Sequence, residues 1–331
     1  MWYRRAGLLA WLLWPASLVF RVLVALRRLA YALRLAPSRS AGVPVVVIGN
    51  LTVGGSGKTP LVIHVAELLK SKGWSPAIVS RGYLGERGAR RDEQPPRAVS
   101  LASDPAEVGD EPVLMARRSG CPVWVGADRA AVAVRLRDEH PDCDVIVMDD
   151  GLQHYALRRD VEVVVVDARG FGNGFMLPAG PLREPRTRLW TVDAVVAHGT
   201  DQVKGFRMRL EGDEAHRATD ARERRKAQSF AGARVHAVAG IGDPNRFFAH
   251  LSQLGVKAVP HAFPDHHPFT AADLEFGDAA PVLMTEKDAV KCKRFAKPTH
   301  WVLPVRAVTD PAFDAWLLRR LGELGDRPKA A

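Results

Sequence analysis

The sequence predicts an α/β fold with a parallel sheet that is flanked by helices. Short apolar runs rich in valine and isoleucine recur along the chain, and most of them are continuous rather than alternating. Such runs are typical of parallel strands that are covered on both faces. Segments with helical periodicity lie between the runs, so strands and helices alternate. A glycine-rich loop joins the first of these runs to the helical segment after it.

The expected elements follow one another in chain order. Strands are expected at 43–48, 77–79, 123–125, 145–148, 161–166, 194–197, 235–239, 282–284 and 301–305, and helices at 58–72, 111–118 and 129–139. Gly73 follows the first of these helices and is its expected C-terminal cap. The polar residues between the runs are expected to form loops.

Length and composition limit the class of protein. The chain has 331 residues, enough for roughly two domains, and 47% of them are hydrophobic. The formal net charge of +10 favours an anionic partner, which leaves nucleic acid, an anionic membrane surface and a phosphorylated substrate open. Three widely spaced cysteines form neither a disulfide framework nor a metal-ligand pattern.

The N-terminal segment is expected to attach to a membrane. An apolar run at 6–20 follows Arg4 and Arg5, and tryptophans and further arginines flank it. A helix of that length reaches ~22 Å, less than the ~30 Å hydrocarbon core of a bilayer. Arg21 and Arg28 share one helix face, as in a basic amphipathic helix on an anionic surface. Spanning and interfacial placement both stay open, and a signal peptide or a buried core helix are the alternatives.

The composition divides the chain into three parts. Residues 1–38 are expected to form the membrane-associated helix, 41–205 the domain with the glycine-rich loop, and 206–331 a smaller α/β domain. The stretch 211–228 is polar and highly charged. We expect it to be an exposed connection near the domain boundary.

The glycine-rich loop predicts a nucleotide phosphate site and hence a P-loop NTPase type of sheet. The residues GGSGKT end as phosphate-binding loops do, although Thr52 replaces the glycine expected at the first position. Glycines let the backbone wrap a phosphate, and the helix N-terminus adds partial positive charge. Lys58 is expected to reach the β- and γ-phosphates. The residues expected to bind nucleotide are Thr52, Val53, Gly54, Gly55, Ser56, Gly57, Lys58 and Thr59.

An acid pair follows the apolar run 145–148. Asp149 and Asp150 are expected at the carboxyl end of that strand, where ligands bind in such sheets. Together with the Thr59 hydroxyl they are candidate ligands of Mg²⁺. An ordinary strand that ends in a turn is the alternative.

Seven stretches in this order resemble the tetraacyldisaccharide 4′-kinase family, which is the lipid A 4′-kinase family of Gram-negative bacteria. The resemblance extends from the N-terminal helix almost to the end of the chain. The stretches are VIGNLTVGGSGKTP (47–60), SRGY (80–83), GDEP (109–112), MDDGLQHY (148–155), GNGFMLPAGPLREP (172–185), FPDHHPF (263–269) and MTEKDAVK (284–291).

The resemblance implies a reaction and its setting. The γ-phosphate of ATP would pass, with Mg²⁺, to the 4′-hydroxyl of tetraacyldisaccharide 1-phosphate, the lipid A disaccharide 1-phosphate. The enzyme would work at the cytoplasmic face of the inner membrane of a Gram-negative bacterium. It would contact membrane lipids, but no nucleic acid or protein partner is implied.

The resemblance also implies roles for single residues. Lys58, Asp110 and His266 are expected to be catalytic, and the division of base and orienting roles between Asp110 and His266 stays open. Asp110 as a helix N-cap and His266 and His267 as surface residues are the alternatives. Glu184 is implied as a further metal ligand.

Two arginines are expected to contact anionic groups. Arg183 is a possible phosphate contact, and Arg81, in the arginine-rich segment 80–91, is a candidate for gripping the sugar headgroup because guanidinium pairs with phosphate through two bonds. A solvated loop is the alternative for that segment. For Asn173, His154 and Lys287 the resemblance gives no role.

Two other classes of protein compete with the kinase. A regulatory GTPase or a metal-insertion NTPase would share the phosphate loop, but the nearest match to its guanine-reading motif, at 285–288, has no asparagine. A DNA-binding or membrane-scaffold protein would explain the charge. No nucleic-acid-binding motif in the sequence supports it.

Overall fold

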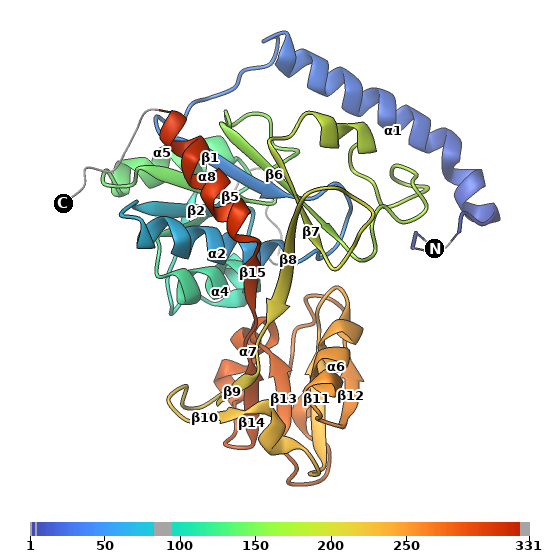
Figure 1. The fold of residues 1–331 in the computed structure, drawn as a ribbon, viewed down its shortest axis with the longest axis vertical. Coiled ribbons are helices and arrows are strands. Elements are labelled where there is room, and N and C mark those ends of the chain that lie inside the picture. The colour runs from blue at the N-terminus through green and yellow to red at the C-terminus, as the bar shows by residue number, and fades with distance from the viewer. Residues whose placement is uncertain (1, 4, 83–94, 325–331) are drawn as a thin grey trace.

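The computed structural model describes the chain except residues 1, 4, 83–94 and 325–331, and its strands form two sheets (Figure 1). The strands of the large sheet are β1 (Val45–Gly49), β2 (Pro76–Ser80), β3 (Arg97–Val99), β4 (Val123–Val125), β5 (Val145–Asp149), β6 (Val161–Asp167), β7 (Ala194–His198), β8 (Phe206–Glu211) and β15 (Arg306–Thr309). Those of the small sheet are β9 (Glu214–Arg217), β10 (Arg224–Lys226), β11 (Val235–Ala239), β12 (Ala258–Ala262), β13 (Val282–Thr285) and β14 (His300–Leu303). The helices are α1 (Leu8–Ala32), α2 (Lys58–Ser71), α3 (Pro105–Val108), α4 (Asp110–Ser119), α5 (Arg129–Glu139), α6 (Pro244–Gln253), α7 (Glu286–Cys292) and α8 (Pro311–Glu323), with short 3₁₀ turns η1 (Arg186–Trp190), η2 (Ala227–Phe230), η3 (Ala272–Leu274) and η4 (Lys293–Phe295).

The large sheet confirms the predicted α/β fold. Its described strands run in the order β15-β8-β7-β6-β1-β5-β2-β4-β3, and β1 lies between β5 and β6 and parallel to both. These three central strands are buried along their whole length. Each apolar run that predicted a strand overlaps a strand of one of the two sheets. Burial on both faces therefore explains why the runs are continuous.

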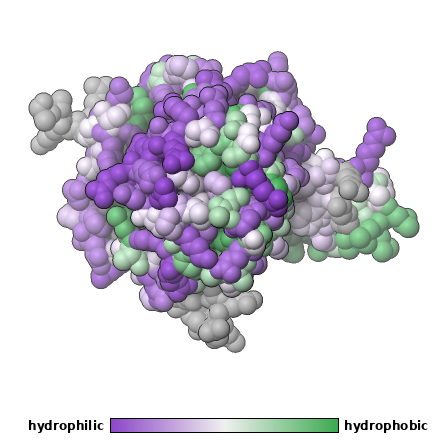
Figure 2. All heavy atoms as spheres, turned by 90° about the horizontal axis from the view of Figure 1, so that it is seen from below, coloured by the Kyte–Doolittle hydropathy of each residue, from purple (hydrophilic) through white to green (hydrophobic). Residues whose placement is uncertain are grey.

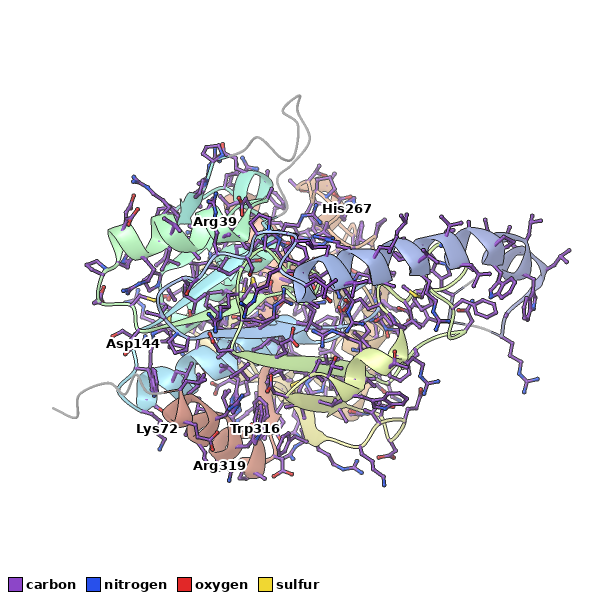
Figure 3. All side chains as sticks on the ribbon, turned by 90° about the horizontal axis from the view of Figure 1, so that it is seen from above. Arg39, Lys72, Asp144, His267, Trp316 and Arg319 are labelled. Atoms are coloured by element: carbon purple, nitrogen blue, oxygen red, sulfur yellow. The ribbon has the colours of Figure 1, made fainter. Side chains whose placement is uncertain are left out.

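Side chains of β1 alternate between two apolar layers. Val46 and Ile48 belong to the layer that contains α2, α4 and α8. Val45 and Val47 belong to the opposite layer, which contains α5 and, partly buried, Phe20 of α1. Figure 3 accordingly shows Trp316 of α8 on the side of the molecule that faces away from α1.

Strands β8 and β15 join the two halves of the molecule, which we call the large lobe (41–211 and 306–324) and the small lobe (214–303). The chain enters the small lobe after β8 and returns through β15, which pairs with β8 in antiparallel orientation (Figure 1). Helix α8 then packs into the core of the large lobe. The predicted domain boundary at residue 206 stays a prediction. In the folded chain, strands β8 and β15 and helix α8 belong to the large lobe.

The stretch 211–228 is more than the exposed connection that its polarity predicts. Strands β9 and β10 pair with each other, and β9 also pairs with β14 at the edge of the small sheet. Ala215 and Ala227 are fully buried in the small-lobe core. Two small apolar residues therefore anchor a hairpin most of whose other side chains are polar, and they do not stand out in the sequence pattern.

Helix α1 lies along the large lobe and exposes most of its apolar side chains. Within its 25 residues, Ala10 and Ser17 are the buried ones, and Ser17 donates to Met176 O at 2.8 Å. Leucines and tryptophans on the rest of the helix are exposed, and Figure 2 shows an apolar protrusion at one side of the molecule. By length and composition this helix is long and apolar enough to cross a membrane.

Candidate active site

The phosphate loop has the strand–loop–helix geometry that the sequence predicts. Strand β1 ends at Gly49, and α2 begins at Lys58. Gly54 and Gly57 have φ angles of +94° and +86°, a region that glycine adopts without strain. A Cβ on Gly57 would also lie 2.8 Å from His198 Nδ1. The positive φ angle and the close approach of His198 therefore both require glycine at position 57.

Thr52 does not disturb the loop. It forms an isolated antiparallel bridge with Leu182, and the neighbouring Val53 N–H donates to Pro181 O at 2.9 Å. This backbone is extended and paired, so no property of glycine is needed there. The departure from the usual first position thus lies at the loop entrance, before the chain turns.

Lys58 points back along the loop to the end of β1. Its Nζ donates to Asn50 Oδ1 at 3.1 Å and lies 3.6 Å from Asp150 Oδ1. The Asn50 amide also donates to Gly54 O at 3.3 Å, and Arg169 donates to Gly55 O. These hydrogen bonds fix the loop in front of the α2 N-terminus, whose first N–H groups lack intrahelical partners.

Asp149 and Asp150 lie at the carboxyl end of β5, next to β1, and differ in electrostatics. Burial raises the pKa of Asp150, but Lys58 and Arg183 outweigh burial and hold it well below its usual range. Arg183 forms two bonds to its carboxylate, of 2.9 and 2.7 Å. Burial, Glu111 and Asp150 instead raise the pKa of Asp149 to about 7.

The orphaned oxygen of Asp149 fits a divalent cation. The Ser80 hydroxyl donates to Oδ2 at 3.0 Å, whereas among the described residues Oδ1 is buried without a hydrogen-bond partner. Those residues contain no cluster of three or more His, Cys, Asp or Glu with metal-binding geometry. Kinase sites commonly hold Mg²⁺ through one or two carboxylates together with the phosphates. Asp149, with the Thr59 hydroxyl at the start of α2, suits such a site.

The carboxylate oxygens of Glu184 already have protein partners. Its carboxylate is 1% exposed and accepts hydrogen bonds from Tyr155 and, at 3.2 Å, from Gln153. Arg188 Nε lies 3.6 Å away. Glu184 would become a ligand only by exchanging these donors for the metal, so its predicted role stays a prediction.

Asp110 and His266 meet across the two lobes. Asp110 is buried as the first residue of α4, and Gly109 occupies the N-cap position that was the alternative role for Asp110. His266 Nδ1 lies 3.2 Å from both oxygens of this carboxylate, although 156 positions separate the residues. His267 instead lies 3.3 Å from Asp273. The pair that the resemblance implies is therefore in contact.

The charges around this pair favour the ionised forms of both residues. Burial raises the pKa of Asp110, but the His266 hydrogen bond, Lys287 and Lys291 lower it to about 2. The hydrogen bond to Asp110 raises the pKa of His266. His266 also has a φ of +60°, which is uncommon for a residue with a side chain and typical of functional sites.

A cavity of about 1000 Å³ extends from the phosphate loop to the neighbours of the Asp110–His266 pair. Its wall includes the phosphate loop from Gly55 to Thr59, Glu111 beside Asp110, and Lys287 of α7. Strands β8 and β15 and helix α6 complete it. The space thus lies between the lobes, with the phosphate loop on one side and α7 on the other.

Comparisons with known proteins agree with this geometry. A sequence model described as tetraacyldisaccharide-1-P 4′-kinase matches residues 9–322. The chain belongs to that family.

Relatives of the family are similar over nearly their whole length. The tetraacyldisaccharide 4′-kinase of Methylobacillus flagellatus is 47% identical over 98% of this chain and 96% of the relative. That of Aromatoleum aromaticum is 51% identical over 92% of this chain and 91% of the relative. A crystal structure of LpxK from Aquifex aeolicus in complex with ATP has a TM-score of 0.75 and 28% identity, and covers 95% of this chain and 100% of that one. The resemblance found in the sequence is confirmed.

Near the acid pair, Asn50 and Arg129 were not singled out from the sequence, and His154 was named without a role. Asn50 ties Lys58 to the loop, although it stands within the loop motif itself. Arg129 is buried at the start of α5, and burial together with Arg81 lowers its pKa to about 10 despite Asp150 and Asp149. Burial and Arg129 lower the pKa of His154 to about 4. Arginine at a helix start gave no signal in the sequence, because only the folded sheet brings it to the acids.

The predicted substrate contacts have different settings. Arg183 is held by Asp150 and Asn50, so in this arrangement it organises the acid pair. Arg81 is exposed just after β2, and the segment 83–91 of the arginine-rich stretch lies outside the described residues. Asn173, left without a role, bonds Ala179 O and Phe175 N within its own loop.

Proposed function

We propose that this chain transfers the γ-phosphate of ATP to the 4′-hydroxyl of tetraacyldisaccharide 1-phosphate. One observation carries the proposal: the phosphate loop lines the same cavity as Glu111 and Lys287, which flank the Asp110–His266 pair. A simple nucleotide switch needs only the phosphate loop. A kinase needs the phosphate loop and the carboxylate–histidine pair, because it must bind ATP and also orient an acceptor hydroxyl.

On the donor side, the residues of the phosphate loop bind and orient ATP. The loop N–H groups and the α2 N-terminus would cradle the phosphates, and Lys58 would exchange Asn50 for the β- and γ-phosphates. Asp149 and Thr59 would hold Mg²⁺, which neutralises the charge that develops on the phosphates. Arg183 would keep Asp150 ionised beside this site.

On the acceptor side, Asp110 would accept the hydrogen bond of the 4′-hydroxyl and take its proton as the phosphate transfers. A carboxylate with a pKa of about 2 is ionised at neutral pH but is a weak base. Phosphoryl transfer with a loose transition state needs orientation more than strong basicity. His266 would fix the rotamer of Asp110 from the opposite lobe.

The location of the enzyme is part of the proposal. The exposed apolar side chains of α1 would enter the lipid of the inner membrane from its cytoplasmic face. Arginines on and after the helix favour an anionic leaflet. A substrate anchored by its acyl chains would then meet the site without leaving the membrane.

The GTPase alternative loses its remaining sequence support. Asp288, at the end of the nearest guanine-reading match, is fully buried and accepts Gly240 N at 2.9 Å and Thr285 Oγ1 at 2.6 Å. A residue that reads guanine must point into the nucleotide site. Asp288 instead stabilises the start of α7.

The proposal is tested by transfer from γ-labelled ATP in mixed detergent micelles that contain tetraacyldisaccharide 1-phosphate. Labelled lipid is expected with the wild-type chain and not with Lys58→Ala. Nucleotide hydrolysis without labelled lipid would refute the acceptor assignment. A second assay with GTP in place of ATP distinguishes the nucleotide.

A further inference from the structure

Lys287 of α7 lies beside the Asp110–His266 pair, and the proposed function gives it no role. Its Nζ lies 2.7 Å from Glu111 Oε1, 3.1 Å from Asp265 Oδ1 and 4.0 Å from Asp110 Oδ2. The side chain is 14% exposed and lines the cavity between the lobes. A buried ammonium with three carboxylates around it is expensive to desolvate, so its place demands an explanation.

The contacts of Lys287 fall on the direct neighbours of both members of the pair. Glu111 follows Asp110 in α4, and Asp265 precedes His266 in its loop. One ammonium therefore ties the backbone that carries the carboxylate to the backbone that carries the imidazole. These two segments belong to different lobes and have no chain connection nearby.

The charged groups that face Asp110 come from three elements. Lys287 and Lys291 come from α7, with Lys291 Nζ 3.7 Å from Asp110 Oδ2. His266 and Asp265 come from the loop before η3, and Glu111 comes from α4 itself. Lys291 is also held by Asp288 at 2.9 Å, whereas Lys287 is the cation that reaches Glu111 and Asp265.

We infer that Lys287 is a positioning residue, which holds Asp110 and His266 together across the lobes and keeps their charges balanced for phosphate transfer. The inference rests on the proposed function. Lys287 stays charged throughout the working range, because Glu111, Asp110 and Asp265 outweigh burial and raise its pKa well above the usual range. It acts on both members electrostatically, since it lowers the pKa of Asp110 and opposes the raised pKa of His266.

A second ion pair offers a matched control, which separates structural support between the lobes from an effect on Asp110. Arg118 Nη1 and Glu286 Oε2, 2.8 Å apart, also join α4 to α7. Arg118 stands in the last turn of α4, whereas Asp110 stands at its start. Arg118→Met thus weakens the same junction of lobes without removing a charge next to Asp110.

The test compares Lys287→Met, Lys287→Arg and Arg118→Met in the full chain, with labelled ATP and the lipid acceptor in micelles. Lys287→Met should lower kcat by ~10- to 100-fold and change the KM for ATP by less than about three-fold, because misplacing a reacting group by about 1 Å has effects of this size. Lys287→Arg should recover most of the rate. Arg118→Met should keep kcat within about three-fold of the wild type.

The pH profile separates positioning from folding. A lost cation lets His266 hold its proton more tightly, so the alkaline limb of the kcat profile should move to higher pH in Lys287→Met. The position of a limb does not depend on the fraction of folded enzyme, so it is decisive even for a destabilised variant. An unmoved alkaline limb, or equal kinetics for Lys287→Met and Arg118→Met, would overturn the inference. A wild-type chain that makes no labelled lipid would overturn the proposed function instead.

Discussion

The two halves of the candidate site are built in different ways. The phosphate half comes from neighbouring parallel strands and a loop of contiguous residues, so the sheet alone places Lys58 and Asp150 together. The acceptor half is assembled from α4 of the large lobe and a loop of the small lobe. The first half is therefore present whenever the sheet is folded, and the second exists only when the lobes are in contact. Binding of ATP and transfer of phosphate should respond separately to mutation.

The largest effect is expected from Lys58→Ala, which removes the cation from the phosphate half. Turnover should fall by ~10³-fold or more, because a charge aimed at the transferring phosphate acts in a water-poor site. Affinity for ATP should fall as well. The measurement is labelled-phosphate transfer together with ATP binding. Unchanged ATP affinity would contradict the assignment of Lys58 to the phosphate half.

His266→Asn tests the acceptor half with little change in the backbone. Asparagine tolerates the left-handed φ of +60° better than most residues do, so the loop should keep its shape. We expect kcat to fall by ~10²-fold, in the range of a lost acid–base or orienting group, with ATP affinity unchanged. His267→Asn, next to it but bonded to Asp273, is the control and should keep most of the activity.

Stability should also depend on pH through the contact between the lobes. The lowered pKa of Asp110 adds stability that is lost as the pH falls toward about 2, and the raised pKa of His266 adds stability that is lost as the pH rises through its folded value. The pair therefore stabilises most between about pH 4 and about pH 6.5. Melting temperatures of the wild type and Asp110→Asn should differ most in that window. A constant difference across pH would show that the pair contributes nothing through its charges.

The smallest effect is expected where the N-terminus touches the phosphate half. The Tyr3 hydroxyl donates to Val53 O at 3.0 Å, and the Arg169 guanidinium lies 4.9 Å above the Tyr3 ring. Tyr3→Phe should raise the KM for ATP by at most about five-fold, the value of one exposed hydrogen bond. Trp2→Phe removes a bond to Pro178 O instead and is the matched control. Equal effects of both changes would mean that the contact does not act on the loop.

The contrast between the two halves of the site also explains how much of the structure could be predicted from the sequence. The central strands and the phosphate loop were predicted because burial on both faces and phosphate binding impose local patterns. Strands β8 and β15 were missed because their residues alternate between charged and apolar, as in Phe206–Glu211, and they lie at an edge of the sheet. No local pattern relates residues 110 and 266, so only the family resemblance joined them.

Residues that act through others were the hardest to predict. Lys287 and Arg129 are charged residues on helices, and most such residues in a sequence are solvated. Their meaning comes from burial beside carboxylates that lie far away in the chain. Glu184 shows the converse, since the resemblance marked it as important but its contacts are Tyr155 and Gln153.

The central claim is that the phosphate half, from the large lobe, and the acceptor half, from both lobes, form one kinase site, and Asp110→Asn tests it most directly. ATP affinity and single-turnover transfer to tetraacyldisaccharide 1-phosphate should be measured on the same preparation. We predict ATP affinity within about two-fold of the wild type and transfer lowered by ~10²- to 10⁴-fold. Normal transfer at saturating ATP together with weakened ATP binding would contradict the claim, because Asp110 would then belong to the phosphate half.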